Sequence, residues 1–122
     1  MGELRQHLVK ETQGQKITYV VDTIFTPENA DRIAALAEGA DLFFCESPFL
    51  DEDEDQATRR YHLTARQAGA LARAARARRL NVFHFSPRYE GRYGELAAEA
   101  NAEYLGQQAR YAELGREHAP LP

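Results

Sequence analysis

The sequence predicts an α/β domain in which a small, mainly parallel sheet is built from the element order βαβαβα. Three short stretches rich in β-branched and aromatic residues favour strands, and segments with apolar residues at helical spacing separate them. Strands that alternate with helices pair in parallel through right-handed crossovers. The 122 residues, 43% of them hydrophobic, suit one globular domain. We expect a single domain over 1–122, with 1–15 as an N-terminal extension and 106–122 as a C-terminal tail.

The first predicted strand and helix lie between residues 16 and 39. Residues 16–21 (KITYVV) favour a buried strand that ends at Asp22. The pair Thr26-Pro27 offers an N-cap followed by a proline at the first helical position. Apolar residues then recur at helical spacing until Gly39, a residue type that favours helix C-termini.

The second strand and helix follow the same plan. Residues 41–45 (DLFFC) favour a buried strand that ends at Glu46. Residues 47–61 hold a proline and an acidic block, and we expect a long loop there with room for a helical turn. A capping box at residues 64–67 (TARQ) opens a helix that runs to about Arg78.

The third strand is predicted at residues 80–83 (LNVF) and ends at His84. A last helix begins near Arg92, and its apolar spacing allows a continuation through Tyr111 and Leu114. Parallel sheets normally have both faces covered. Three strands with three helices make a thin domain, which we interpret as half of something larger.

Composition excludes several classes of protein. The net charge of −4 argues against a protein whose main role is to coat nucleic acid. No apolar stretch approaches the roughly 20 residues that span a bilayer, and the N-terminus lacks the apolar core of a signal peptide. The single cysteine, Cys45, excludes an internal disulfide, and we expect a buried, inert thiol. We therefore expect a cytoplasmic protein without membrane contact.

Ligand-capable side chains follow each predicted strand: Asp22, Glu46 and His84. Taken singly, each has a structural explanation, since either carboxylate can cap a turn and a histidine can end a strand. Together they fall at the carboxyl edge of a parallel sheet, where ligands gather. Carboxylates with imidazole suit zinc, iron or manganese, and equally suit proton transfer.

Three further polar residues are expected near the same edge. His62 precedes the second helix, where an imidazole can act as a general acid, bind phosphate, or simply lie exposed near a cap. Ser86 and Arg88 follow His84 in one loop, and a hydroxyl with a guanidinium suits a phosphate. A surface ion pair is the alternative for Arg88.

Four stretches carry a resemblance to a known family: VVDT (20–23), CESPF (45–49), HLTARQAG (62–69) and HFSPRY (84–89). In this order they resemble the C-terminal half of the metallo-β-lactamase fold, in its ribonuclease Z branch, over about residues 16–105. The resemblance implies half of an αββα sandwich. It also implies a two-zinc phosphodiester hydrolase that trims the 3′ end of precursor tRNA.

The resemblance also implies roles for individual residues. Asp22 would bridge two metal ions and His84 would be a terminal ligand of one. Glu46 and His62 would serve proton transfer to the leaving oxygen, with the glutamate orienting the ring. The phosphate would be held by Ser86 and Arg88.

The sequence departs from the family pattern at several positions. Cys45 stands where the branch often has histidine, and Val21 stands where glycine is common. Tyr61 and Leu63 flank His62 where glycine and serine are usual.

The metal-binding pattern HxHxDH is absent, since the four histidines are at positions 7, 62, 84 and 118. We therefore expect a partial active site, weak or absent zinc binding by the chain alone, and no activity from it. The expected partner is the N-terminal half of the fold or a second copy of the chain, and we expect a homo-oligomer. The alternative is a non-catalytic half-fold that acts through self-association or partner binding.

Overall fold

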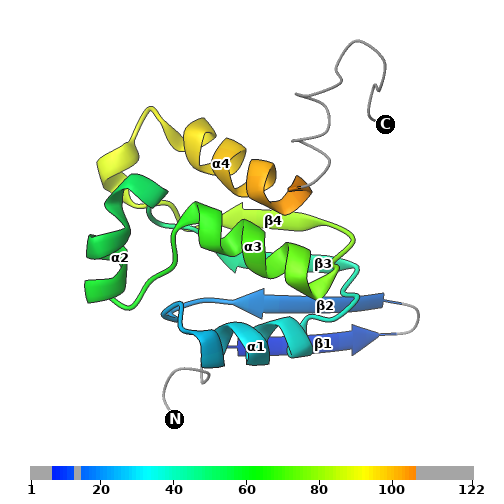
Figure 1. The fold of residues 1–122 in the computed structure, drawn as a ribbon. Coiled ribbons are helices and arrows are strands. Elements are labelled where there is room, and N and C mark those ends of the chain that lie inside the picture. The colour runs from blue at the N-terminus through cyan, green and yellow to red at the C-terminus, as the bar shows by residue number, and fades with distance from the viewer. Residues whose placement is uncertain (1–6, 13–14, 107–122) are drawn as a thin grey trace.

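The protein forms a four-stranded sheet with its helices on one side (Figure 1). The computed structural model describes residues 7–12 and 15–106. The strands, in the spatial order β1-β2-β3-β4, are β1 (His7–Thr12), β2 (Gln15–Val20), β3 (Leu42–Glu46) and β4 (Leu80–Phe83). The helices are α1 (Pro27–Leu36), α2 (Glu54–Arg59), α3 (Ala65–Ala75) and α4 (Tyr93–Leu105), with short 3-10 turns η2 (Asp51–Asp53) and η3 (Pro87–Tyr89).

The predicted α/β class with a mainly parallel sheet is confirmed. β2 pairs with β3 and β3 with β4 in parallel, and α1 and α3 lie in the two crossovers. The structure adds β1, which pairs antiparallel with β2 and lies inside the segment expected to be an extension. The polar composition of HLVKET hid this strand, because an edge strand needs little apolar surface.

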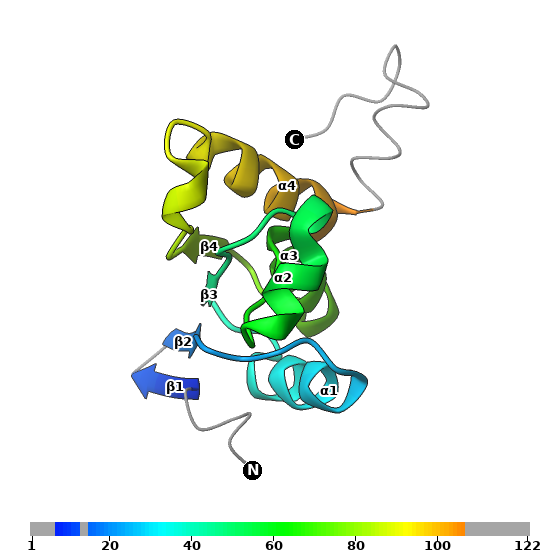
Figure 2. The ribbon, with the colours of Figure 1, turned by 90° about the vertical axis from the view of Figure 1, so that its left-hand side faces the viewer.

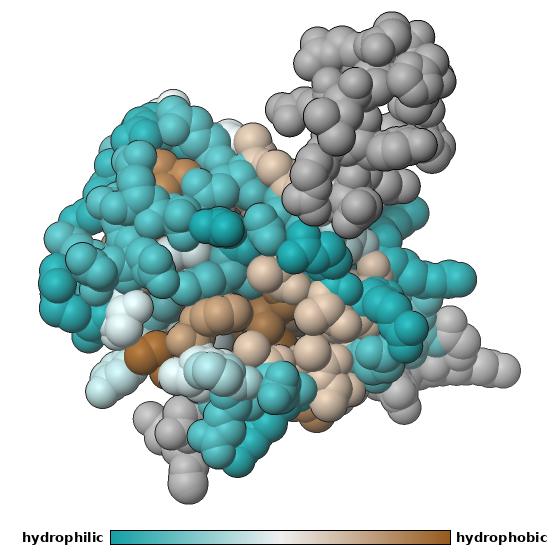
Figure 3. Space-filling model, in the orientation of Figure 1, coloured by the Kyte–Doolittle hydropathy of each residue, from teal (hydrophilic) through white to brown (hydrophobic). Residues whose placement is uncertain are grey.

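All the long helices cover the same face of the sheet (Figure 2). Thr18 and Val20 of β2, and Phe43 and Cys45 of β3, are fully buried on that face. Alternate residues point to the opposite face, where Tyr19 and Phe44 stack with ring centroids 4.6 Å apart. Seen from the helical side the surface is mostly hydrophilic, with apolar residues gathered where α1 adjoins α3 (Figure 3).

Two elements differ from their predicted extent. The capping box of α3 is confirmed: the Thr64 side chain accepts from the backbone N–H of Gln67, and the Gln67 side chain accepts from the backbone N–H of Thr64. The helix ends at Ala75, earlier than predicted, because Arg76 is left-handed at φ 56°. The predicted loop at 47–61 contains η2 and the helix α2. The predicted continuation of α4 through Tyr111 lies outside the described residues, as does His118. Among the described residues, no helix is long and apolar enough to cross a membrane.

Helices α3 and α4 meet at a glycine. A Cβ added at Gly69 would lie 2.1 Å from the backbone oxygen of Ala100, which is far too close for any real contact. Because a helix backbone cannot yield like a flexible side chain, only glycine permits this approach. The contact keeps α3, and with it the segment that carries His62, against α4.

We predict that Gly69→Ala lowers the free energy of unfolding by about 1–3 kcal/mol, the usual cost of overpacking. Gly94→Ala is the matched control, since an added Cβ there meets nothing within 4 Å. The control should be neutral or stabilising by about 0.4–1 kcal/mol, because alanine restricts the unfolded chain. Urea denaturation followed by circular dichroism measures both. Equal stability of the two variants would contradict the packing argument.

Candidate functional site

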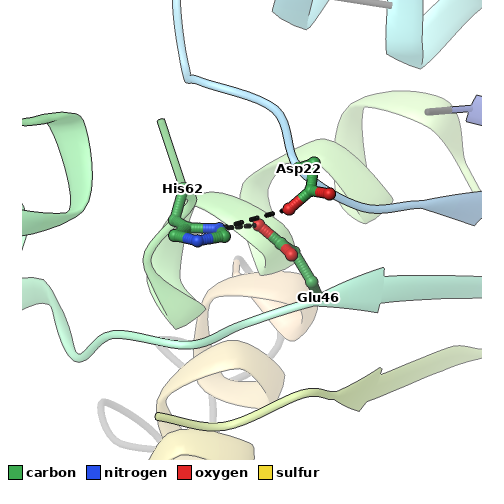
Figure 4. A group of neighbouring side chains, drawn as sticks. All are labelled: Asp22, Glu46 and His62. Atoms are coloured by element: carbon green, nitrogen blue, oxygen red, sulfur yellow. Dashed lines mark hydrogen bonds and ion pairs between the residues drawn. The ribbon is translucent and has the colours of Figure 1, made fainter. Parts of the chain in front are cut away.

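Three side chains converge at the carboxyl edge of the sheet: Asp22, Glu46 and His62 (Figure 4). Glu46 is the last residue of β3, and Asp22 follows β2 by two positions. His62 comes from the segment between α2 and α3. His84, directly after β4, joins them through Glu46. The structure therefore brings together the four residues predicted to act as ligands or in proton transfer.

Glu46 is the centre of this cluster. Its side chain is fully buried, and its two oxygens contact two different rings: Oε2 is 2.7 Å from Nδ1 of His62, and Oε1 is 3.2 Å from Nδ1 of His84. The two imidazoles are perpendicular, with centroids 6.0 Å apart. A buried carboxylate is tolerated only when it is well hydrogen-bonded. Here the two rings supply those bonds.

The shared carboxylate determines which nitrogen of each ring carries the proton. A carboxylate only accepts hydrogen bonds, so each Nδ1 donates to Glu46. In the neutral rings, each Nε2 is then an acceptor that is free of this contact. A carboxylate behind Nδ1 is the usual support for a histidine whose Nε2 binds a metal. The arrangement therefore orients both rings for work at Nε2.

The backbone around the cluster is left-handed at three non-glycine residues. Asp22 has φ 52°, His84 has φ 63°, and Tyr61, just before His62, has φ 59°. Such conformations cost of the order of 1–3 kcal/mol each and concentrate at functional sites. Asp22 and His84 adopt them immediately beyond their strands, where the chain must turn sharply out of the sheet.

His62 is held by the ends of two helices. Its N–H donates to the oxygen of Ala57 at 2.8 Å, and Tyr61 N–H donates to Thr58 at 3.1 Å. These two bonds around the left-handed Tyr61 form a Schellman motif at the end of α2. Two residues after His62, Thr64 begins α3 with its capping box. The histidine is thus fixed from both sides by local hydrogen bonds.

Glu99 of α4 holds both ends of the segment that carries His62. Its Oε2 accepts from the N–H of Asp51 at 2.8 Å and from the N–H of Arg66 at 3.2 Å. One carboxylate thus caps the starts of both η2 and α3, where unpaired N–H groups favour an anion. Burial raises the pKa of Glu99. No sequence pattern marks Glu99 as important, because its role appears only when α4 packs against those two termini.

Three residues of the cluster could together hold a metal ion. Ligand atoms of Asp22, Glu46 and His62 lie within 4.8 Å of one another, and Oδ1 of Asp22 is 4.0 Å from Nδ1 of His62. Carboxylate oxygen and imidazole nitrogen suit zinc and other transition metals. Both oxygens of Glu46 already contact an imidazole, whereas the Asp22 side chain is 57% exposed. Of the two carboxylates, the exposed Asp22 is therefore the one that the rings leave available to a metal.

Ser86 and Arg88, predicted to bind phosphate, make contacts within the protein. The Ser86 hydroxyl accepts from the N–H of Arg88 at 3.3 Å and caps η3. Arg88 donates through Nη2 to Gln56 at 2.7 Å, and its Nη1 lies 3.5 Å from Asp53. Its guanidinium also lies over the ring of Phe49, whose centroid is 6.2 Å from that of His62. Phosphate binding by this pair stays a prediction.

Cys45, next to Glu46 in sequence, belongs to the core and not to the site. It is fully buried, and this burial, followed by the charge of Glu46, raises the pKa of its thiol well above the usual value. A thiol with a raised pKa is a poor nucleophile and a poor metal ligand. Its burial agrees with the inert thiol expected from the sequence.

The chain matches a known protein family. The family model described as the beta-lactamase superfamily domain matches residues 7–85. The chain is 43% identical over 100 residues to a ribonuclease Z of Streptomyces coelicolor, covering 82% of the chain and 29% of that protein. It is 40% identical over 86 residues to a ribonuclease Z of Brevibacillus brevis, covering 70% and 26%. The chain therefore spans less than a third of the length of these relatives.

Solved structures agree on the fold. The metallo-beta-lactamase fold protein YhfI from Bacillus subtilis matches with a TM-score of 0.71 at 23% identity, over 82% of the chain and 38% of that protein. The short form of human tRNase Z matches with a TM-score of 0.58 at 29% identity, over 67% and 31%. The predicted resemblance to a fragment of this fold is confirmed.

We predict that Glu46→Gln disturbs the tautomer of one imidazole. In the metal-free chain at alkaline pH, long-range ¹H–¹⁵N NMR should show both neutral rings as Nδ1–H tautomers. The glutamine amide has one acceptor oxygen and presents an NH₂ donor to the second ring. Only one ring should then keep its Nδ1–H form. Glu38→Gln, which removes a surface partner of Arg76, is the control and should leave both rings unchanged. Two unaltered rings after Glu46→Gln would overturn the shared-acceptor interpretation.

Proposed function

The chain belongs to the beta-lactamase superfamily, and on that premise we propose that it is the C-terminal part of a metal-dependent phosphodiester hydrolase of the ribonuclease Z type. The observation that carries the proposal is the buried Glu46 bonded to two imidazoles beside the exposed Asp22 carboxylate. The relatives named ribonuclease Z support tRNA 3′-end processing as the reaction. We propose a cytoplasmic enzyme with precursor tRNA as substrate.

We assign the metal ligands to Asp22 and His84, with zinc as the ion. The support is chemical, since an exposed carboxylate and a ring whose Nδ1 is already bonded form a suitable pair of ligands. When bound, zinc supplies Lewis-acid chemistry at a phosphodiester. Two ligands do not fill the coordination of two ions. We propose that the remaining ligands come from an HxHxDH segment outside this chain.

His62 is proposed as the general acid and Glu46 as its positioning residue. The ring is held by the Schellman motif and by Glu46, so its Nε2 has a fixed direction. A protonated His62 donates from Nε2 to the leaving oxygen, while the Glu46 carboxylate stabilises the positive ring. Positioned acids of this kind contribute about 10²- to 10⁴-fold to rate.

Ser86 and Arg88 are proposed to hold the phosphate next to the scissile bond. Arg88 offers a planar fork of donors, and its side chain is 37% exposed. Phosphate would compete for the guanidinium with Asp53 and Gln56, its present partners. Substrate binding would therefore loosen the contact between η3 and the 51–59 segment.

The face of the sheet that no described helix covers is proposed to pack against the N-terminal half of the fold. That face carries the stacked rings of Tyr19 and Phe44, and Phe44 is paired in register with both Tyr19 and Asn81. Aromatic and aliphatic side chains on an open sheet face favour burial at about 25 cal/mol per Å². The N-terminal half would cover them and would bring its metal ligands to the same edge.

The test is co-expression with an N-terminal half of a ribonuclease Z that carries HxHxDH. We predict zinc retention and cleavage of a precursor tRNA by the complemented protein. Asp22→Ala should lose metal and activity together, because a carboxylate that would hold the metal is removed. His62→Ala should keep metal but lose about 10²- to 10⁴-fold in kcat. Asp31→Ala, an exposed acid on α1, is the control and should change neither. Loss of metal in His62→Ala would exchange the roles of His62 and His84.

A second candidate is a non-catalytic half-fold that acts through self-association, and the open aromatic face is the observation that favours it. We predict that the chain alone sediments above its 13.8 kDa monomer mass at tens of micromolar protein. Phe44→Asp should shift it toward the monomer, whereas Asn101→Asp on the exposed side of α4 should not. Circular dichroism checks that both variants fold. A wild-type monomer at this concentration would rule out this candidate.

A further inference from the structure

Three consecutive residues directly before His62 form an exposed strip with no ion-pair or ring contact in the described part of the chain. We call Arg59, Arg60 and Tyr61 the RRY strip. Tyr61 is 66% exposed, more than any other large hydrophobic residue described. Both arginines are exposed as well. The strip therefore offers an aromatic face and two guanidinium groups next to the cluster around Glu46.

Local stability does not explain a tyrosine at position 61. The residue lies at the left-handed position of the Schellman motif that ends α2, with φ 59°. Glycine is favoured at this position because it has no Cβ, and a bulky aromatic residue is strained there. The exposed ring gains little from burial in return. A binding role would account for an aromatic side chain that the fold itself disfavours.

The two arginines also differ from the rest of the described arginines. Within residues 15–106, an acidic side chain pairs with each of Arg32, Arg66, Arg73, Arg76, Arg78, Arg88 and Arg92. Arg59 and Arg60 have no such partner there, although the acidic block at 51–55 is close in sequence. Arg79 also has none, but it precedes β4 and so lies at the opposite edge of the sheet.

We propose that the RRY strip binds a single-stranded segment of the RNA substrate next to the scissile bond. Tyr61 stacks on one base, and Arg59 and Arg60 contact the flanking phosphates. Single-stranded RNA is recognised by this combination, because every base has a face for stacking and every linkage carries a negative charge. The inference rests on the proposed function only in taking RNA as the ligand.

The first test measures binding of the chain to a fluorescein-labelled oligouridylate of about ten nucleotides, within the site sizes of stacking proteins, by fluorescence anisotropy in EDTA. Tyr61→Gly should weaken binding about 5- to 150-fold, the range of one base–aromatic stack, while Tyr61→Phe should keep it. Tyr61→Gly should also raise the midpoint of urea unfolding, because glycine relieves the left-handed strain. A tyrosine with only a structural role would lower the midpoint and leave RNA binding unchanged. That result would overturn the inference.

The second test separates the arginines by salt dependence. Arg59→Gln and Arg60→Gln should each reduce the slope of log K against log salt by about 0.7, the contribution of one phosphate contact on a single strand. Arg79→Gln is the matched control, since it removes an equally unpaired arginine at the far edge of the sheet, and its slope should not change. Equal slopes for all three variants would contradict phosphate contacts at the strip.

These outcomes are separate from those of the proposed function, because binding in EDTA requires neither metal nor cleavage. Tyr61-dependent RNA binding without cleavage by the complemented protein would support the RRY strip and contradict the hydrolase. If the complemented protein cleaved precursor tRNA and Tyr61→Gly changed neither kcat nor KM, the result would support the hydrolase and contradict the RRY strip. If Tyr61→Gly instead prevented assembly with the N-terminal half, the strip would be a protein contact and the inference would be wrong.

Discussion

A single buried carboxylate organises this fragment of the fold. Glu46 lies at the end of the inner strand β3 and has no exposed surface, so its oxygens must be satisfied within the protein. The partners come from both sides, His84 from the end of β4 and His62 from the segment before α3. The buried Glu46 is therefore satisfied only if the segments that carry His62 and His84 both pack against it.

The chain meets this requirement by restraining the 47–66 segment at several places. A β-bridge between Phe49 and Thr64 joins the two ends of this segment. Glu99 caps two helix starts within it. Tyr89 accepts from Leu50 N–H at 3.1 Å and donates to Asp53, with burial raising the pKa of its hydroxyl. Strain at Asp22 and His84 persists because the surrounding contacts determine these positions. The site is thus fixed by tertiary contacts that lie outside it.

Sequence patterns predicted what local chemistry determines. The strand at 80–83, the capping box at Thr64 and the ligand-capable residues after each strand follow from composition, spacing and strand order. The shared use of Glu46 by two rings, the double cap of Glu99 and the contacts of Arg88 with Gln56 and Asp53 did not. These depend on distances between residues far apart in the chain, which no local pattern contains. β1 was missed because pairing, and not its own apolarity, makes it a strand.

The charges at this edge of the sheet favour the binding of a cation. Asp22 and Glu46 supply two carboxylates, and among the described residues neither lysine nor arginine forms an ion pair with them. Their polar partners in the site are imidazoles, which balance a carboxylate only when protonated. With neutral rings the cluster keeps excess negative charge, part of it buried, and a divalent cation offsets that charge at short range. Tyr19 and Phe44 belong to the same two strands, β2 and β3, whose ends form this edge, so a domain packed on their face of the sheet would also adjoin the edge. Burial of that face and neutralisation of the edge would then stabilise the same assembly.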